Sequence, residues 1–217
     1  GIIYMGENIG NLREAALEDA EVPTVVVCRE EENKFPTVNI DNYQAVYEMM
    51  EYLIKEVNYQ KIGFISGPLK DITAGKLRFE AYRQALKDNN LVFNEDWVVE
   101  TNFILEEGYQ AGQEIIASSP RPEVVFAASD ELAVGAMQAV KEAGFTVPED
   151  IGLVGFDNIE LSRDVFPNLT TIGQPIYELG KMAAEMIIEL IQGEELTSPD
   201  VYLDYELIIR DSTRSKS

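Results

Sequence analysis

Short runs of apolar, mostly β-branched residues alternate along the chain with longer segments of helical periodicity. The apolar runs predict strands over 2–5, 24–28, 37–40, 61–66, 124–127 and 151–155. Helical patterns lie near 43–57, 74–89, 107–117, 130–143 and 177–191. Because the apolar runs are continuous, they are typical of parallel strands that are buried on both faces. The alternation therefore predicts an α/β fold with doubly wound parallel sheets.

The residues that follow these strands are candidate ligand contacts, because open parallel sheets bind ligands beyond the carboxyl ends of their strands. Asp, Ser and Asn at such positions also cap helices. For Asp41 and Asp130, capping of the following helix is the favoured interpretation. No strong helical pattern follows Asp157 at once, and this favours ligand contact there. The strand-exit positions are Gly6 and Glu7, Asp41 and Asn42, Ser66 and Gly67, Ser129 and Asp130, and Asp157 and Asn158.

The end of one helix is marked by two residues. Gly144 directly follows the helical pattern 130–143, where a residue with positive φ is needed, and glycine adopts that conformation easily. Pro148 follows shortly and prevents the helix from continuing. We therefore expect this helix to end just before Gly144.

The composition excludes several classes of function. The 217 residues include 39 acidic and 17 basic side chains, which gives a formal net charge of -22. A nucleic-acid surface needs clustered Lys and Arg, so this chain is not expected to bind DNA by itself. The acidity indicates a solvated surface. The chain has no His, which excludes Ser-His-Asp and Cys-His catalysis and His-based metal sites. We expect neither a metal nor a catalytic residue.

The number of cysteines and the length of the apolar runs indicate the cellular compartment of the protein. Cys28 is the single cysteine, so no intrachain disulfide can form, which fits a reducing, cytoplasmic environment. No apolar run approaches the length of a membrane span, so no membrane association is expected. The chain begins at Gly1 on an apolar run, without a basic leader, and we interpret this start as a fragment boundary.

The sequence supports neither a nucleotide-binding motif nor a simple catalytic pair. Gly67 and Gly75 are separated by seven residues, and Leu77 follows Lys76, whereas a phosphate-binding P-loop needs four residues and then Ser or Thr. No G-x-G-x-x-G motif follows a strand, so no dinucleotide cofactor is expected. The pair Glu106–Glu107 is better explained as a solvated helix start than as an acid–base pair. Ser129 has no base that would activate it.

Several segments together resemble the core of the lactose-repressor family of bacterial transcription regulators. The strongest is G-F-T-V-P-E-D-I-G-L-V-G-F-D-N over 144–158. It continues into P-N-L-T-T-I-G-Q-P over 167–175 and L-I-I-R-D-S-T over 207–213. The segments S-D-E-L-A-V-G-A-M over 129–137, V-N-I-D-N over 38–42, I-G-F-I-S-G-P-L over 62–69 and R-F-E-A-Y over 78–82 also match. The resemblance covers essentially the whole chain and is specific as a set.

This resemblance implies two similar lobes of periplasmic-binding-protein type, so that 1–217 forms an effector-binding domain. The first lobe would comprise 1–41 and 159–193, and the second 42–158 and 194–217. A hinge would lie at the crossings near 41–42, 158–160 and 193–194. The first elements of the first lobe and the DNA-binding helix-turn-helix would be absent from this chain. In the helix 177–191, the residues Met182, Met186, Ile187 and Leu190 would form either core or a subunit contact.

The effector contacts of the family map onto five residues of this chain. Arg78 matches an arginine that reaches ligand hydroxyls or carboxylates, with a surface ion pair as the alternative. Phe103 lies where the family stacks an aromatic ring on the effector, with core packing as the alternative. Ser129 and Asp130 match a polar pair that faces the cleft between the lobes. Asp157 matches an aspartate that accepts hydrogen bonds from ligand hydroxyls.

The function that the resemblance implies is effector sensing by a homodimeric regulator. A sugar or sugar derivative would bind between the lobes and allosterically control DNA binding through the absent head domain. The spacing from Leu69 to Arg78 resembles the catabolite-control branch, which binds a phosphorylated protein through basic residues. The corresponding helix segment here, 181–189, is acidic to neutral and favours a small molecule. The alternatives are the solute-binding protein of a sugar transporter, which has the same fold, and an enzyme. The runs 167–175 and 207–213 favour the regulator.

Overall fold

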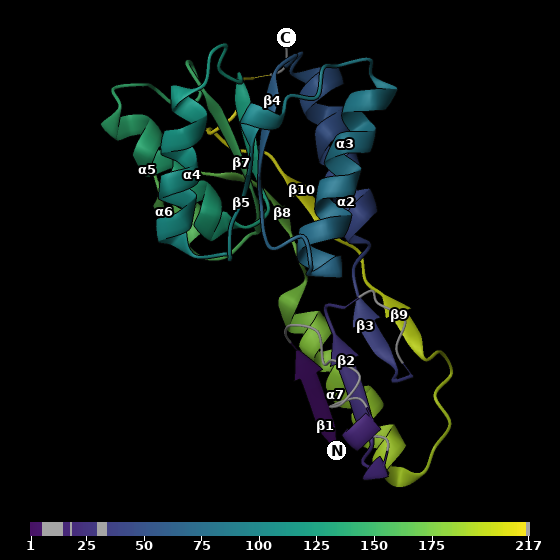
Figure 1. Ribbon diagram of the computed structural model, residues 1–217. Helices are drawn as coiled ribbons and strands as arrows, with labels where there is room; N and C mark the ends of the chain where they lie inside the picture. Colours follow the sequence, from purple (N-terminus) through teal and green to yellow (C-terminus); the bar gives the residue numbers. More distant parts are fainter. Residues whose placement is uncertain (6–14, 18, 30–33, 216–217) are drawn as a thin grey trace. The chain divides into compact units, whose positions relative to one another are not determined.

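The computed structural model describes residues 1–5, 15–17, 19–29 and 34–215 (Figure 1). Gly6 and Glu7, at the first predicted strand exit, lie outside the described residues. The chain divides into two compact α/β units. Unit 1 comprises Gly1–Asp41, Asp71–Thr73 and Pro175–Tyr205, and unit 2 comprises Asn42–Lys70, Ala74–Gln174 and Glu206–Ser217. The predicted fold class, α/β with parallel-sheet lobes, is confirmed.

The chain crosses between the units at places that correct two of the predicted crossings. The division after Asp41 is the same in the prediction and in the structure. The chain leaves unit 2 after Gln174 rather than near 158, and it returns at Glu206 rather than near 193. The reason is strand pairing, because β8 (Thr170–Gly173) pairs with a strand of unit 2 and β9 (Asp200–Tyr202) pairs with a strand of unit 1.

In the described part of unit 1, a parallel sheet packs against the long helix α7 (Ile176–Gln192). Its strands are β1 (Ile2–Met5), β2 (Thr24–Val27), β3 (Thr37–Asn39) and β9, in the order β1-β2-β3-β9. Helix α7 contributes Met186 and Ile187 to a buried cluster with Val25, Val27 and Val38. Met182 and Leu190 pack against the same cluster. The structure therefore supports the core interpretation of these four residues of α7.

Unit 2 contains a sheet of six strands. They are β4 (Ile62–Ser66), β5 (Val98–Glu100), β6 (Val124–Ala127), β7 (Gly152–Asp157), β8 and β10 (Glu206–Ile208). Their order is β10-β8-β7-β6-β4-β5, and all neighbours are parallel except β10 and β8. Every residue of β4 and β6 is buried, as expected from their continuous apolar sequences.

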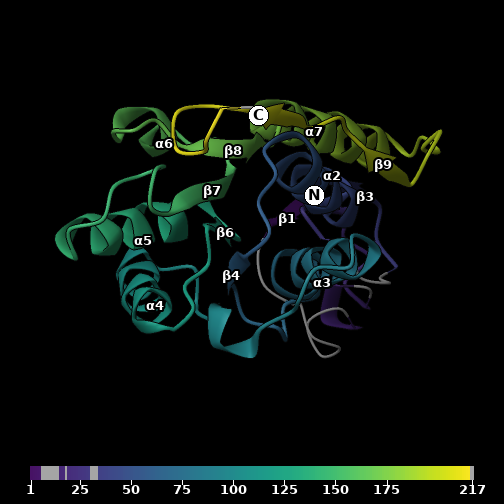
Figure 2. The ribbon, with the colours of Figure 1, turned by 90° about the horizontal axis from the view of Figure 1, so that it is seen from above.

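Helices cover both faces of this sheet. Figures 1 and 2 show α2 (Asn42–Glu51) and α3 (Arg78–Asp88) on one face, and α4 (Leu105–Ala117) and α5 (Asp130–Glu142) on the other. Further helical segments are the π-helical turns Tyr52–Glu56 and Ile72–Leu77, the 3-10 turn Glu95–Trp97 and α6 (Leu161–Asp164). Aromatic rings pack between the sheet and α3 on the α2–α3 face. The ring centroids of Phe64 on β4 and Tyr82 on α3 lie 4.8 Å apart.

The ends of the helices follow local signals. Helix α5 ends at Glu142, and Gly144 has a φ of 84°, as predicted for the residue just beyond a helix. Helix α7 ends at Gln192 and is followed directly by Gly193, whose φ is 78°. Within the described ranges, no helix combines the length and the apolar character that crossing a membrane would require.

Candidate functional site

The carboxyl ends of five parallel strands meet at one edge of the sheet in unit 2. Parallel neighbours end at the same edge, so residues that are far apart in sequence come together there. They are Ser66 and Gly67 at the end of β4, Phe103 after β5, Ser129 and Asp130 after β6, Asp157 and Asn158 at the end of β7, and Gln174 after β8. This edge brings together four of the five predicted effector contacts, and Arg78 joins them from the start of α3.

Asp157 is the last residue of β7, and its carboxylate has a defined direction. Gln174 Nε2 donates a hydrogen bond to Asp157 Oδ1 over 2.6 Å. Burial raises the pKa of the Asp157 carboxyl, while the charge of Arg78 and the bond from Gln174 oppose this rise. The backbone φ is 110° at Asp157 and 56° at Asn158, which is uncommon for residues other than glycine. The strand exit therefore holds a half-buried carboxylate in an unusual backbone conformation.

Arg78 is buried at this edge with only 5% of its surface exposed. Its Nε donates to Asn42 Oδ1 over 2.9 Å, and its Nη1 donates to the backbone oxygen of Ala128 over 2.5 Å. Its Cζ lies 3.4 Å from the centroid of the Phe156 ring, a cation–π contact. This burial is inconsistent with the surface ion pair considered as its alternative. Arg78 instead places a positive charge close to Asp157.

Phe103 packs against the exit of β4. A Cβ atom on Gly67 would lie 1.9 Å from Phe103 Cζ, so the aromatic ring occupies the space that a side chain at 67 would fill. The φ of Phe103 is 63°, and the residue is half-buried. The ring thus combines a packing contact with some exposed surface. Both the stacking and the packing interpretations of Phe103 are compatible with this arrangement.

Ser129 and Asp130 have different surroundings, although they are adjacent. Ser129 is the N-cap of α5, because its side chain accepts a hydrogen bond from Leu132 N over 3.3 Å. Capping, expected of Asp130, is thus performed by Ser129. Asp130 is 0% exposed, and its two oxygens accept from Thr171 Oγ1 over 2.6 Å and from Ile159 N over 2.9 Å. Burial raises the pKa of Asp130 to about 7.

Arg210 and Gln174 belong to this network but were not predicted as site residues. Arg210 Nη2 donates to Asn158 Oδ1 over 2.6 Å, and its Nη1 donates to Leu169 O over 2.7 Å and to Ser162 Oγ over 3.1 Å. Gln174 directly follows β8, so the strand-exit rule would have identified it had this strand been predicted. Arg210 lies in the family-like run 207–213, but no spacing in the sequence relates it to Asn158.

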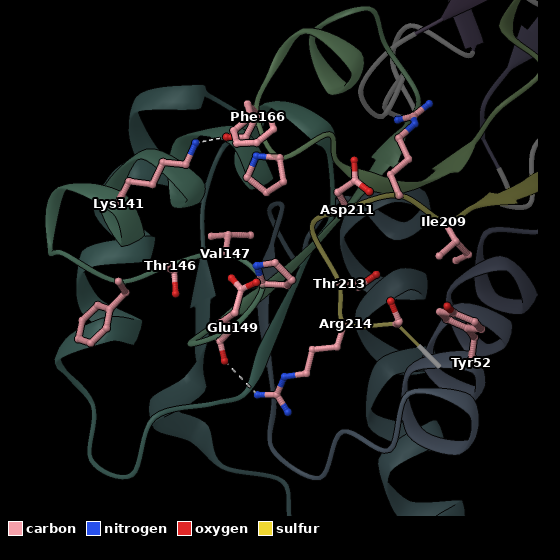
Figure 3. A pocket seen from close by; sticks show the side chains of 15 residues that line it. Tyr52, Lys141, Thr146, Val147, Glu149, Phe166, Ile209, Asp211, Thr213 and Arg214 are labelled. Carbon is pink, nitrogen blue, oxygen red and sulfur yellow. Dashed lines mark hydrogen bonds between the residues drawn. The ribbon is translucent and has the colours of Figure 1, made fainter. Parts of the chain in front are cut away.

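A groove of about 1160 Å³ lies at the other end of β7 and β8 (Figure 3). Its lining comes from the segments before these strands, such as Thr146–Glu149 and Phe166–Pro167, and from the segment after β10. Figure 3 shows Lys141 bonded to the backbone oxygen of Phe166, and Arg214 directed at the backbone oxygen of Glu149. None of the five predicted contacts lines this groove. Across the described ranges, no cluster of three or more carboxylates or cysteines could hold a metal ion.

The model of the periplasmic binding protein-like domain matches residues 51–213. The transcriptional regulator RegA of Clostridium acetobutylicum is 38% identical over 217 residues, which cover 99% of this chain and 65% of RegA. The structure of the regulator CcpA of Lactococcus lactis has a TM-score of 0.90 and 30% identity, covering 99% of this chain and 78% of CcpA. The chain belongs to the periplasmic binding protein-like domains of lactose-repressor-type regulators.

A further member of the family was solved with a sugar. The structure described as a complex of the regulator CelR with cellobiose has a TM-score of 0.90 and 28% identity, and covers 98% of this chain and 65% of CelR. These relatives carry the names of regulators rather than of enzymes. The chain spans less than two thirds of the length of the curated relative RegA.

Proposed function

We propose that this chain is the effector-sensing part of a transcription regulator and that it binds a small carbohydrate at the carboxyl ends of β4 to β8. The observation that carries the proposal is the carboxylate of Asp157, which lies at a strand exit with Arg78 close by. Asp157 accepts hydrogen bonds from ligand hydroxyls, and Arg78 supplies positive charge beside it. Phe103 stacks on the C–H face of a sugar ring, and Ser129 completes the polar contacts.

The class of ligand is supported by the polarity of this edge and by one relative. Carboxylate, guanidinium and hydroxyl groups next to an aromatic ring suit a molecule with many hydroxyls and an apolar face. CelR, of the same family, was solved with cellobiose. That the ligand also contacts unit 1, between the two lobes, stays a prediction from the family resemblance. So do the homodimer and the cytoplasmic location.

A route from the ligand to the rest of the regulator begins at Gln174. This residue donates to Asp157 and is the last residue of unit 2 before the chain enters unit 1 at Pro175. A ligand that binds Asp157 either competes with the hydrogen bond from Gln174 or reinforces it. In both cases the ligand changes how firmly Gln174 is held, at the point where the chain crosses between the units. Shifting such an equilibrium from 1:99 to 99:1 needs roughly 10⁴-fold preference for one state. DNA binding would then be controlled through a helix-turn-helix head. The names of the relatives favour this function over a transporter's solute-binding protein.

The test is a thermal-shift screen of the regulator with monosaccharides, cellobiose, phosphosugars and purines. A compound at about 100 times its dissociation constant should stabilise the protein by about 2.7 kcal/mol. Replacing Asp157→Asn keeps the Oδ1 acceptor for Gln174 but removes the charge. We expect this variant to bind a stabilising compound about tenfold or more weakly. Asp164→Asn, at an exposed carboxyl in α6, is the matched control. Unchanged affinity in Asp157→Asn would show that the ligand binds elsewhere.

A further inference from the structure

The backbone at the end of β7 has a conformation that needs support from its surroundings. Asp157 and Asn158 are consecutive residues with φ of 110° and 56°. Such conformations are strained for residues other than glycine and persist only where neighbouring groups impose them, although Asn tolerates them better than most residues. The conformation of the segment 157–159 therefore depends on the contacts that hold it.

Asp130 supplies one of these contacts from the first position of α5. Its Oδ2 accepts from Ile159 N over 2.9 Å, and its Oδ1 accepts from Thr171 Oγ1 on β8 over 2.6 Å. The carboxylate reaches these donors across β7. Gly155 makes this possible, because a Cβ atom at that position would lie 2.2 Å from Asp130 Oδ1. Asp130 thus joins the segment beyond β7 to both α5 and β8.

Arg210 supplies a second contact from the segment after β10. Its Nη2 donates to Asn158 Oδ1 over 2.6 Å, while Nη1 donates to Leu169 O over 2.7 Å. One guanidinium therefore fixes the side chain of Asn158 to the segment that leads into β8. The planar arrangement of donors on arginine suits such a bridge, which the single ammonium of lysine reproduces poorly.

We propose that Asp130 and Arg210 are positioning residues that hold 157–159 in its conformation and so set the direction of the Asp157 carboxylate. Asp130 then acts through Asp157 instead of contacting the ligand, because it is completely buried and both its oxygens have protein donors. This inference revises the sequence-based expectation for Asp130. Its importance for binding rests on the proposed function of Asp157, but the conformation itself can be tested without ligand.

The test uses nuclear magnetic resonance of the 217-residue chain without ligand. The side-chain amide of Gln174 donates to Asp157 Oδ1, so its resonance reports the position of that carboxylate. In Asp130→Ala we expect this resonance to move and the amide of Ile159 to exchange about tenfold faster. In Asp130→Asn both should stay near the wild-type values, because the amide oxygen can accept from Ile159 and its NH₂ can donate to Thr171. Arg210→Met should also move the Gln174 resonance. Glu114→Gln, at an exposed carboxyl on α4, is the control and should not.

The pH dependence of the same signals separates a specific contact from a general loss of structure. The amide shift of Ile159 should titrate with a midpoint near the Asp130 pKa of about 7, and this titration should vanish in Asp130→Asn. The charged groups that affect Asp130 are Asp157 on β7 and Arg210 after β10. An unmoved Gln174 resonance in both Asp130→Ala and Arg210→Met would overturn the proposal. If those variants do not fold, a wild-type Ile159 amide that exchanges as fast as an unprotected amide would overturn it, because the hydrogen bond to Asp130 must slow this exchange. Neither result depends on the outcome of the ligand screen.

Discussion

Asp130 carries a carboxyl group whose ionisation is opposed by its burial. Its pKa is raised from 3.8 to about 7, because desolvation outweighs the hydrogen bonds from Thr171 and Ile159. Between these two values the folded protein retains a proton that the unfolded chain releases. The contribution of this group to folding stability therefore falls as the pH rises from about 4 to 7, and it changes little above 7.

Asp130→Asn should remove this part of the pH dependence. Relative to the variant, the wild-type protein should lose about 2–3 kcal/mol of unfolding free energy between pH 5 and pH 8. Urea unfolding of both proteins at the two pH values measures the difference. Any constant cost of the amide cancels, because only the change with pH is compared. Parallel stability profiles would contradict the raised pKa of this carboxyl.

At the scale of residues, the sequence predicted five of the side chains at this edge, but it predicted neither Gln174 and Arg210 nor the hydrogen-bond partners within the network. Asp157, Ser129 and Asp130 lie at strand exits, as the rule for parallel sheets requires. The bonds of Asp130 to Thr171 and Ile159 join positions that are 41 and 29 residues apart in sequence. The pairing of β6 with β7 and of β7 with β8 brings these partners together, and a periodicity along one strand carries no information on either register.

At the scale of elements, helices α4 and α5 approach each other closely at glycines. A Cβ atom on Gly135 would lie 2.1 Å from the backbone oxygen of Leu105 and 2.6 Å from Tyr109 N. On the facing helix, a Cβ on Gly108 would lie 2.5 Å from the backbone oxygen of Leu132. These atoms belong to the helix backbones, so a side chain at either position can be accommodated only if the helices move apart.

Gly135→Ala should therefore destabilise unit 2 by about 1–3 kcal/mol, the usual cost of overpacking a well-packed interior. Gly180→Ala in α7 is the matched control. Among the described residues nothing lies within 4 Å of a Cβ at 180, and alanine in a helix is favoured over glycine by roughly 0.5–1 kcal/mol. Denaturant unfolding should show opposite signs for the two variants. Equal effects would indicate that helix propensity, rather than the approach of α4 and α5, determines the result.

Fully buried apolar elements could be predicted from the sequence, whereas short elements with polar side chains could not. The strand over 124–127 was predicted with the bounds that the structure has, because it is fully buried and apolar. The strands β5, β8, β9 and β10 were not assigned, since each has three or four residues and most carry polar side chains. Missing β8 and β9 displaced two of the predicted crossings, because these strands decide to which unit their segments belong.

At the scale of the whole molecule, the negative net charge of the chain is unfavourable for contact with DNA. It sets no such limit on the proposed binding of a small ligand. The chain has 39 acidic and 17 basic residues, a formal net charge of -22. Its family consists of regulators, and a DNA-binding regulator must present clustered Lys and Arg to the phosphate backbone. The candidate site uses basic side chains differently, because Arg78 and Arg210 are engaged by Asn42, Ala128 and Asn158 within unit 2.

We therefore expect the 217-residue chain to show no binding to a labelled double-stranded DNA at about 10 µM protein and about 50 mM salt. Fluorescence anisotropy measures this directly, and low salt favours binding because fewer counterions oppose phosphate contacts. Net repulsion between an acidic domain and DNA should keep the signal at the value of free DNA, with or without a stabilising sugar. A basic protein of similar mass serves as the positive control. Binding whose affinity falls linearly with the logarithm of the salt concentration would contradict this expectation, and would place a phosphate-contacting surface among the 17 basic residues of the chain.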